Sequence, residues 1–264
     1  MAGTVDWVPG DVDVRVPSAA RVYDYLLGGA HNFEVDRIVG KKVLEVQPNG
    51  RQIARSNRAF LNRAVRFLIN QGITQFLDLG SGIPTVGNVH EVAQRADPEC
   101  RVVYVDHDPV AVAHSQMILQ DNDHAAVVDA DLTHPDVVLG DPTVRKFLDF
   151  DRPIGLLMVA VFHFVPDDRN PGDIVARYVH ALSAGSFVAL SHLTADDMKE
   201  ESAAVVEAMR NSRDPMYFRS YAEVAALFET LDVVEPGVVS APDWRPDQNA
   251  AQQAGVYVGI GRVR

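Results

Sequence analysis

The sequence predicts an α/β protein with a mostly parallel, seven-stranded sheet flanked by helices. Two observations carry this prediction. From residue 73 onward, short apolar runs alternate with amphipathic helical stretches, which is the pattern of βα units on a parallel sheet. Before that point the chain has helical stretches and no strand-like run. The 264 residues suffice for one large domain with a small addition.

The first part of the chain is expected to be mainly helical. Residues 1–16 lack sustained periodicity and are predicted to form a loose leader. Ser18 suits the N-cap of a first helix, and the pair Gly28 and Gly29 ends it. An amphipathic stretch at 35–46 and a long helix at 51–70 follow. Residues 17–70 are therefore assigned to a helical extension.

Residues 71–264 are assigned to the sheet domain. The fourth of its strands has eight residues without a charge, as expected for a strand buried on both faces. The strands are predicted at residues 76–79, 101–105, 125–128, 154–161, 186–190, 231–235 and 256–260. Helices are predicted at residues 86–96, 110–119, 144–148, 174–182, 196–209 and 221–227.

Composition narrows the classes of function. The formal net charge of −12 argues against a nucleic-acid partner, which needs a positive surface. Residues 1–70 are the exception, with ten basic and seven acidic side chains. No run approaches 18 apolar residues, and the first ten lack a signal-peptide pattern, so we expect a cytoplasmic protein without a membrane partner. The single Cys100 excludes an intramolecular disulfide. Nothing in the sequence indicates the oligomeric state.

The most informative motif is the Asp-Leu-Gly-Ser-Gly run at residues 78–82. Gly80 and Gly82, on either side of Ser81, allow a ligand to lie against bare backbone. A loop that binds a pyrophosphate usually has no carboxylate in front, because an anion repels phosphates. Asp78 therefore favours a positively charged ligand without phosphate. S-adenosylmethionine has an ammonium and a sulfonium, so the leading hypothesis is a methyltransferase.

Polar side chains also follow the other strands of the predicted sheet. Ligands of open α/β sheets bind outside the carboxyl ends of the strands, so these positions form the candidate site. Each can also be explained as a helix cap or turn residue. They are Asp106, His107 and Asp108 after the second strand, Asp129 and Asp131 after the third, His163 after the fourth, and Ser191 and His192 after the fifth.

A nicotinamide enzyme is an alternative that the glycine loop argues against. Asp106 stands 24 residues after Gly82, where a carboxylate could bind ribose hydroxyls in either class of enzyme. The dinucleotide fingerprint requires a third glycine three residues after Gly82, and this chain has Thr85 there. A second alternative is a protein that binds S-adenosylmethionine without turnover, as a sensor or regulator.

These motifs resemble those of class I S-adenosylmethionine-dependent methyltransferases, which have a Rossmann-like fold. The resemblance lies in residues 78–82, 103–106, 129–132 and 161–166. Residues 17–29, 57–61 and 148–153 look like an actinobacterial methyltransferase family whose members mostly have no assigned substrate. The similarity runs from Pro17 to Val263. His107 is a departure, since such proteins often have Asn there.

The resemblance implies roles for the matched positions. The methionine end of the cofactor would face Asp78 and the backbone of Gly80, Ser81 and Gly82. The ribose would bind Asp106, with His107 beside it. The adenine would lie next to Asp131 and Leu132, and the floor near the sulfonium would be lined by Ala160 through His163.

Catalysis is expected to need few residues. Methyl transfer is an in-line displacement with an activated leaving group, so alignment matters most. For an acceptor that carries a proton, His163 is the first candidate for a general base and His192 the second. Both can also be explained as residues that order a turn or line the pocket. No metal is expected, because no histidines pair closely at ligand spacing with a carboxylate.

The N-terminal helices invite two interpretations. They are not needed for a sheet that begins some 40 residues later, so a lid over a small-molecule acceptor, with Tyr23 and Asn32 in contact with it, is one hypothesis. An ordinary packing helix capped by Gly28 is the other. Four arginines at helical spacing, of which one could bind a carboxylate, most simply form a solvated face: Arg51, Arg55, Arg58 and Arg66.

Overall fold

A computed structural model describes residues 13–84, 87–196, 198–246 and 255–264 of the chain. Most of the leader predicted at 1–16 therefore lies outside the described residues. Three helices open the described chain: α1 (Ala19–Leu27), α2 (Glu34–Val46) and α3 (Gly50–Asn70). The Ser18 hydroxyl caps α1 by accepting the Arg21 N–H, and Gly28 ends the helix with a left-handed φ of 88°. The predicted boundaries of all three helices are confirmed to within a few residues.

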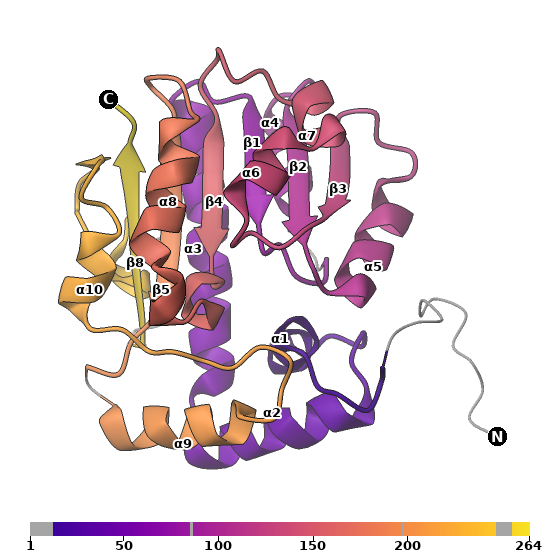
Figure 1. The fold of residues 1–264 in the computed structure, drawn as a ribbon, viewed down its shortest axis with the longest axis vertical. Helices are drawn as coiled ribbons and strands as arrows, with labels where there is room; N and C mark the ends of the chain where they lie inside the picture. Colours follow the sequence, from indigo (N-terminus) through magenta and orange to yellow (C-terminus); the bar gives the residue numbers. More distant parts are fainter. Residues whose placement is uncertain (1–12, 85–86, 197, 247–254) are drawn as a thin grey trace.

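The central sheet has eight strands in the order β3-β2-β1-β4-β5-β8-β6, with β7 also paired to β8 (Figure 1). The first five are parallel, and β8 runs antiparallel to β5, β6 and β7. The strands are β1 (Gln75–Leu79), β2 (Arg101–Asp106), β3 (Ala125–Asp129), β4 (Gly155–Val159), β5 (Phe187–Leu193), β6 (Asp232–Val233), β7 (Val239–Ser240) and β8 (Val256–Arg262).

The predicted number of seven strands is wrong by one. The missed strand is β7, which has only two residues and owes its strand geometry to its partner β8. So short a segment carries no alternation of apolar and polar residues that could reveal it. The fourth strand also ends two residues before its predicted limit, because Ala160 takes a left-handed φ of 58°.

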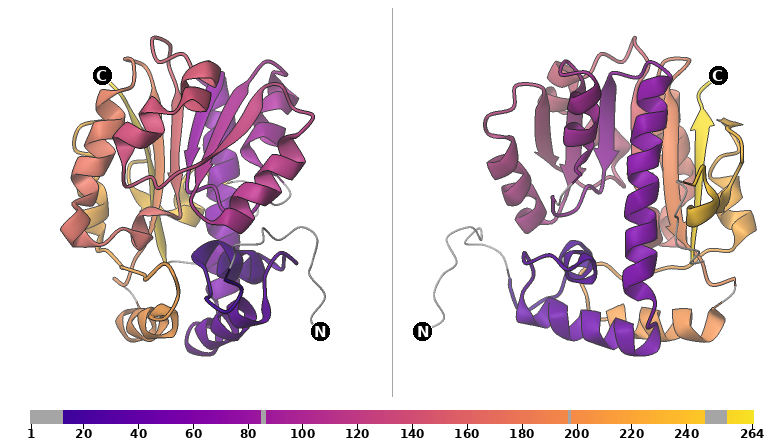
Figure 2. Two further views of the ribbon diagram at one scale, coloured as in Figure 1. Left: turned by 45° about the vertical axis from the view of Figure 1, so that its right-hand side comes forward. Right: turned by 180° about the vertical axis from the view of Figure 1, so that it is seen from behind.

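Helices cover both faces of the sheet (Figure 2). One face packs against α6 (Pro135–Gly140), α7 (Pro142–Phe147), α8 (Pro171–His180) and α10 (Tyr221–Ala226). The other packs against α3, α4 (Val89–Ala96) and the end of α5 (Pro109–Leu119). The sequence did not predict α6, whose six residues are too few for helical periodicity.

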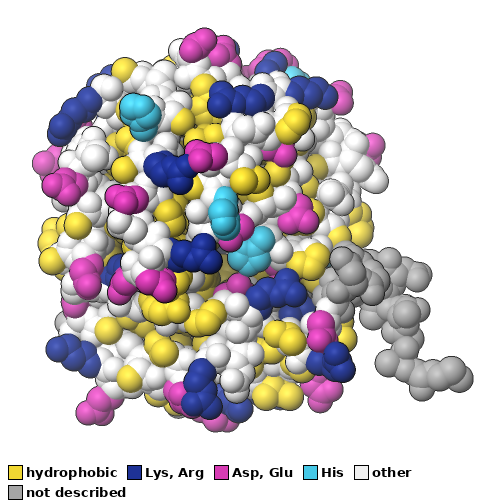
Figure 3. All heavy atoms as spheres, in the orientation of Figure 1, with side chains coloured by type: hydrophobic (Ala, Val, Ile, Leu, Met, Phe, Trp, Pro, Cys, Tyr) yellow, Lys and Arg dark blue, Asp and Glu magenta, His cyan; other side chains and the backbone are white. Residues whose placement is uncertain are grey.

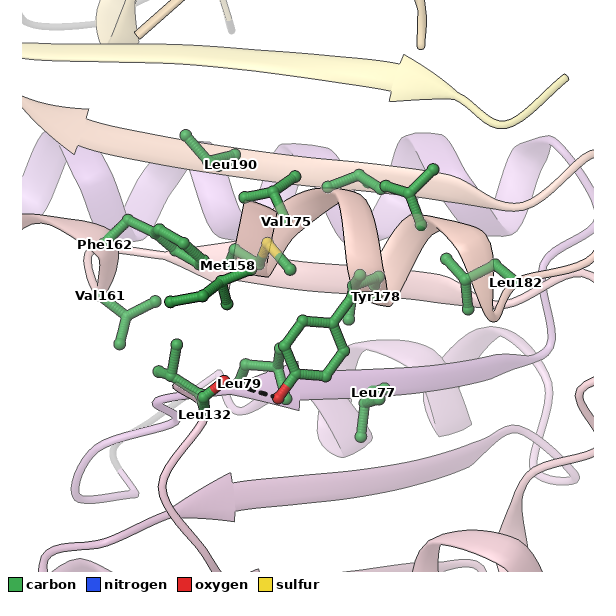
Figure 4. Packing of buried hydrophobic residues seen from close by; sticks show 14 of the residues in the cluster. Leu77, Leu79, Leu132, Met158, Val161, Phe162, Val175, Tyr178, Leu182 and Leu190 are labelled. Atoms are coloured by element: carbon green, nitrogen blue, oxygen red, sulfur yellow. Dashed lines mark hydrogen bonds between the residues drawn. The ribbon is translucent and has the colours of Figure 1, made fainter. Parts of the chain in front are cut away.

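The hydrophobic core between the sheet and α8 shows that alternate residues of a strand point to opposite faces of the sheet. Leu77 and Leu79 of β1 point toward α8, together with Met158 of β4, whereas Phe76 belongs to the cluster on the opposite face (Figure 4). The buried Tyr178 of α8 donates its hydroxyl to the carbonyl of Leu132 at 2.8 Å. This bond ties α8 to the loop after β3 and so fixes one wall of the candidate site.

A third layer lies beyond the carboxyl ends of the parallel strands. It consists of α1, α2 and α9 (Lys199–Met209), which cross below the strand tips in Figure 1. Its members pack through Val22 of α1, Val43 of α2, and Val205 and Met209 of α9. The layer therefore combines the N-terminal extension with a helix that follows β5. None of the described helices is both long and apolar enough to span a membrane.

Candidate active site

A cavity of about 430 Å³ lies between the strand tips and the layer formed by α1, α2 and α9. Figure 3 shows a hollow in the middle of this face, with basic and histidine side chains near it. Its walls include residues from the ends of β1, β2, β4 and β5 and from the loop after β3. The cavity is therefore placed where open α/β sheets bind their ligands.

The glycine loop after β1 lines this cavity, as the sequence predicted. Gly80 and Gly82 have φ values of 66° and 67°, which side chains rarely adopt. The N–H groups of Gly80 and Ser81 both donate to the carbonyl of Val105, at 2.8 and 3.2 Å. The loop is thus folded back onto β2, and its glycines are required by backbone geometry.

The two glycines differ in what surrounds them. A Cβ at Gly82 would meet no described heavy atom within 4 Å, so this position leaves room for a ligand. A Cβ at Gly80 would lie 2.2 Å from Cγ2 of Val161. Gly80 therefore allows the loop to pack against the segment after β4, and the idea that its missing side chain leaves space for the ligand is wrong.

Asp78 is buried at the base of the glycine loop and borders the cavity. Burial raises the pKa of its carboxyl to about 7, while the nearby Arg58 guanidinium acts in the opposite direction. Arg58 also lines the cavity, and no described residue accepts a hydrogen bond from its buried Nε. This end of the cavity therefore offers one acidic and one basic group, which suits a zwitterion.

Asp106 ends β2 with both carboxylate oxygens engaged. Its Oδ2 accepts the Gly82 N–H at 2.7 Å, and its Oδ1 accepts the Asp108 N–H at 2.8 Å. Burial raises the pKa of this carboxyl, and the two backbone donors oppose that shift. Each oxygen keeps a lone pair, so Asp106 can hold the loop and still accept ligand hydroxyls.

His107 lies at the rim of the cavity and pairs with Asp214, a residue of the loop after α9. The His107 Nε2 and the Asp214 Oδ1 are 3.1 Å apart. This hydrogen bond raises the pKa of His107 to about 9, so the pair is charged at neutral pH. Asp214 also accepts the N–H of Ala19 at the start of α1. It thereby connects the helical layer to the tip of β2.

The loop after β3 places Asp131 and Leu132 on the cavity wall. The Asp131 Oδ1 accepts the Thr133 N–H at 2.8 Å, which fixes the start of the loop. Leu132 is buried, and its backbone carbonyl is the acceptor for Tyr178. Both residues thus lie on the cavity wall beside the tips of β2 and β3.

Ala160 and His163 line the cavity after β4. The left-handed Ala160 donates its N–H to Ser191 Oγ of β5 at 2.8 Å. His163 is 4% exposed, and no described residue forms a hydrogen bond with its Nδ1. Burial lowers the pKa of His163 well below its usual value, and the neighbouring His192 and Arg219 act in the same direction. His163 is therefore neutral and a weak base.

The structure places His192 outside the cavity lining. Its Nδ1 donates to the carbonyl of Leu193 at 2.7 Å, and its Nε2 accepts from Nη1 of the buried Arg219 at 2.7 Å. Burial lowers the pKa of His192 to about 4. Both ring nitrogens are engaged, so the structure favours the packing interpretation of this residue over contact with a substrate.

Of the two N-terminal residues predicted to contact the substrate, only one lines the cavity. Tyr23 lines the cavity from α1. Asn32 is buried elsewhere, because its Nδ2 donates to Asp24 Oδ2 at 2.7 Å and to the Gly29 carbonyl at 3.0 Å. A Cβ at Gly29 would overlap Asp24. Asn32 and the glycine pair therefore build the turn after α1, and Asn32 does not reach the ligand space.

Several residues of the site were missed by sequence reasoning. Arg58 was recognised only as one of four spaced arginines, and its neighbour Asn57 only as part of a matched motif. Ser191 was grouped with the polar residues after the fifth strand, but its contact with Asn57, 134 positions away, was not predicted: Ser191 Oγ donates to Asn57 Oδ1 at 2.6 Å. Arg219, from beyond α9, donates to the carbonyls of Phe162 and Val165 and so fixes the segment that carries His163. From one sequence, only the charged and small residues that follow the strands could have been predicted as site residues.

The residues present fit the cofactor that the sequence suggested. Three buried polar atoms on cavity-lining residues have no hydrogen-bond partner among the residues that the structure describes, namely Arg58 Nε, Ser81 Oγ and His163 Nδ1. Gly82 leaves open space, and carboxylates stand at the ends of β1 and β2 and in the loop after β3. No group of three or more metal-ligating side chains occurs among the residues that the structure describes. A cationic nucleoside without phosphate matches this donor set.

The sheet order and the acidic, glycine-bordered cavity at its strand tips define a class I methyltransferase fold with a site for S-adenosylmethionine. Comparison with known families makes the assignment specific. Residues 5–264 match the model of a family described as S-adenosyl methyltransferase, and the chain belongs to that family. S-adenosylmethionine is its methyl donor.

Solved structures agree with this assignment. The chain is similar to a DUF574 family protein from Streptomyces avermitilis, with 37% identity and a TM-score of 0.92 over 96% of this chain and 99% of that one. It is also similar to a putative methyltransferase from Thermobifida fusca, with 38% identity and a TM-score of 0.92 over 99% and 100% of the two chains. Human N-acetylserotonin methyltransferase shares the fold at 14% identity and a TM-score of 0.51, over 95% of this chain and 63% of that one. A comparison with curated proteins found no match.

Proposed function

We propose that this enzyme transfers the methyl group of S-adenosylmethionine to a small molecule bound between the strand tips and the layer of α1, α2 and α9. One observation carries the proposal: a single cavity has carboxylates and a glycine loop on one side and apolar helix residues on the other. Such a cavity can hold a cationic cofactor and an acceptor next to each other, which is the arrangement that in-line transfer requires.

Each wall of the cavity has a distinct task in this proposal. Asp78 binds the ammonium of the cofactor, and Arg58 binds its carboxylate. Asp106 accepts hydrogen bonds from the ribose, with His107 beside it. Asp131 and Leu132 border the adenine. The backbone of Gly80, Ser81 and Gly82 lies against the methionine end, and Ala160 forms part of the floor.

The chemistry requires alignment more than acid or base strength. When bound, the cofactor supplies a methyl carbon on a sulfonium, whose departure needs no protonation. The contribution of this chain is to hold the acceptor in line and to keep water out, which the α1, α2 and α9 layer does as a cover. His163 remains the candidate for contact with the acceptor. Its depressed pKa supports a role as a hydrogen-bond partner rather than as a strong general base.

Family membership decides against the nicotinamide enzyme considered from the sequence. The remaining alternative is binding without turnover. Calorimetric titration with S-adenosylmethionine and with NAD, followed by a screen for S-adenosylhomocysteine release with pools of small molecules, tests the proposal. We expect binding of S-adenosylmethionine and release with at least one pool. Binding of NAD alone would refute the proposal, and tight cofactor binding with no release from broad pools would favour a sensor. The cytoplasmic location stays a prediction.

A further inference from the structure

The helical layer gives the acceptor side of the cavity an apolar character. Every described residue that α1, α2 and α9 contribute to the cavity lining is uncharged. Seven of them are aliphatic or thioether side chains: Ala19, Ala20, Val22, Leu26, Val43, Val205 and Met209. The charged groups of the lining, which include Arg58, Arg169 and Arg213 as well as the carboxylates, come from α3, the strand tips and the loops. The cavity thus has a charged side and an apolar side, and the apolar side is formed by α1, α2 and α9.

The polar groups beside this apolar side are already engaged with one another. The Ser191 hydroxyl accepts from Ala160 and donates to Asn57 Oδ1. The Asn57 amide then donates to the Tyr23 hydroxyl at 3.0 Å, which donates in turn to the carbonyl of Ala54 at 3.0 Å. This chain satisfies three side chains that would otherwise offer hydrogen bonds to a ligand. A charged group placed against these three side chains would lose its hydration, and their hydrogen bonds to one another would not compensate it.

His163 is the exception among these groups. It lines the cavity, and only 4% of its surface is exposed to solvent. Its ring lies against those of Phe164 and His192, at centroid distances of 4.4 and 5.6 Å. No described residue forms a hydrogen bond with its buried Nδ1. An imidazole without a partner at this place is a ready acceptor for one O–H or N–H group.

We propose that the methyl acceptor of the function proposed above is an uncharged, mostly apolar small molecule that presents one O–H or N–H group to His163. In the transfer, a lone pair of that oxygen or nitrogen forms the new bond to the methyl carbon. The carbon–sulfur bond breaks, and its electron pair stays on sulfur as S-adenosylhomocysteine forms. The proton of the acceptor is released to bulk water when the products leave the cavity, so charge and atoms balance.

Three naphthalene derivatives that differ in one substituent test this inference. The protein is first saturated with S-adenosylhomocysteine, and 2-naphthol, 2-methoxynaphthalene and 2-naphthoate are then titrated by calorimetry. We expect 2-naphthol to bind about 2- to 12-fold more tightly than 2-methoxynaphthalene, the range for one net hydrogen bond. We expect 2-naphthoate to bind at least about tenfold more weakly than 2-naphthol, because its carboxylate would lose hydration against apolar side chains and groups that are already hydrogen-bonded.

The outcomes separate the inference from the proposed function. If S-adenosylhomocysteine fails to bind, the proposed function is refuted. If it binds and 2-naphthol does not, or if 2-naphthoate binds as tightly as 2-naphthol, the function stands and the acceptor inference is overturned. In His163→Phe, which keeps a planar ring, the preference for 2-naphthol over 2-methoxynaphthalene should disappear. Retention of that preference would remove His163 from the inference.

Two adjacent residues of α1 provide a matched pair of variants. Leu26 and Leu27 are both partly buried, but only Leu26 lines the cavity. Leu26→Asp should weaken 2-naphthol binding at least about tenfold and leave S-adenosylhomocysteine binding unchanged, because it places a carboxylate on the apolar side. Leu27→Asp should change neither. Equal loss of 2-naphthol binding in both folded variants would contradict the inference, and if either variant unfolds, the wild-type titrations still decide.

Discussion

Gly80 and Gly82 have nearly the same left-handed φ, and the structure predicts different consequences for replacing them with alanine. At either position the backbone strain should cost about 1–2 kcal/mol of the free energy of unfolding. At Gly80 the new Cβ would also lie 2.2 Å from Val161 Cγ2, and overpacking adds about 1–3 kcal/mol. We therefore expect a loss of about 2–5 kcal/mol for Gly80→Ala and about 1–2 kcal/mol for Gly82→Ala.

A double-mutant cycle isolates the contact with Val161. Val161→Ala alone removes two buried methyl groups and should cost about 1.5 kcal/mol. In Gly80→Ala/Val161→Ala the clash with Cγ2 is gone, so the double variant should be more stable than the sum of the single losses by about 1–3 kcal/mol. The Val161 Cβ remains 2.8 Å from the new methyl group, which places the coupling toward the lower end of that range.

Urea unfolding of the three single variants and the double variant measures these values, and calorimetry with S-adenosylhomocysteine adds the functional readout. Gly82→Ala should fold and bind this ligand more weakly, because its methyl group enters open space on the cavity wall. Equal destabilisation by Gly80→Ala and Gly82→Ala, or strictly additive losses in the cycle, would refute the assignment of Gly80 to packing against Val161.

Three further predictions concern charged groups. The pKa of Asp78 is about 7, and a cation binds its ionised form, so the affinity for S-adenosylmethionine should rise with pH. At pH 6 the affinity should be about tenfold weaker than its limiting value at high pH. Calorimetry should show no pH dependence for Asp78→Asn, and a wild-type affinity that does not change with pH would contradict the role of Asp78. Asp106→Ala should weaken that affinity by roughly 1.5–3 kcal/mol, the range for hydrogen bonds to a charged group; unchanged affinity in a folded variant would exclude the ribose role. Because the pKa of His107 is raised to about 9, the stability contributed by its pair with Asp214 should be full below about pH 6.5 and be lost as pH rises through 9. His107→Gln should thus reduce the free energy of unfolding by roughly 0.2–1 kcal/mol at pH 6.5 and by nothing at pH 10, and an equal loss at both pH values would count against the pair.

The order of elements and the acidic side of the site could be predicted from the sequence for a physical reason. Parallel strands in a buried sheet are short apolar runs, and the residue that follows each run lies at the same edge of the sheet. Asp78, Asp106 and Asp131 could therefore be grouped without knowledge of any contact. The structure places all three on one cavity wall.

The apolar side could not be predicted in the same way, because it depends on contacts between distant segments. The bond from Ser191 to Asn57 joins residues 134 positions apart, and the bond from Arg219 to the Phe162 carbonyl joins residues 57 positions apart. Periodicity predicted an amphipathic α2 and a helix at α9, but not that their apolar side chains meet. Asn32 failed as a substrate contact for a local reason, since its amide donates to Asp24 of α1, eight positions earlier, across the turn that ends the helix.

The position of β8 has a consequence for how this chain folds. This strand lies between β5 and β6 in the sheet, although it is the last of the eight to be synthesised. Until residue 262 has left the ribosome, the edge of β5 has no partner on that side, and β6 and β7 have no strand to join. Nascent chains of this protein should therefore expose an unpaired edge of β5 from the time this strand forms until residue 262 has left the ribosome. Chaperones bind such exposed edges, and aggregation can begin at them.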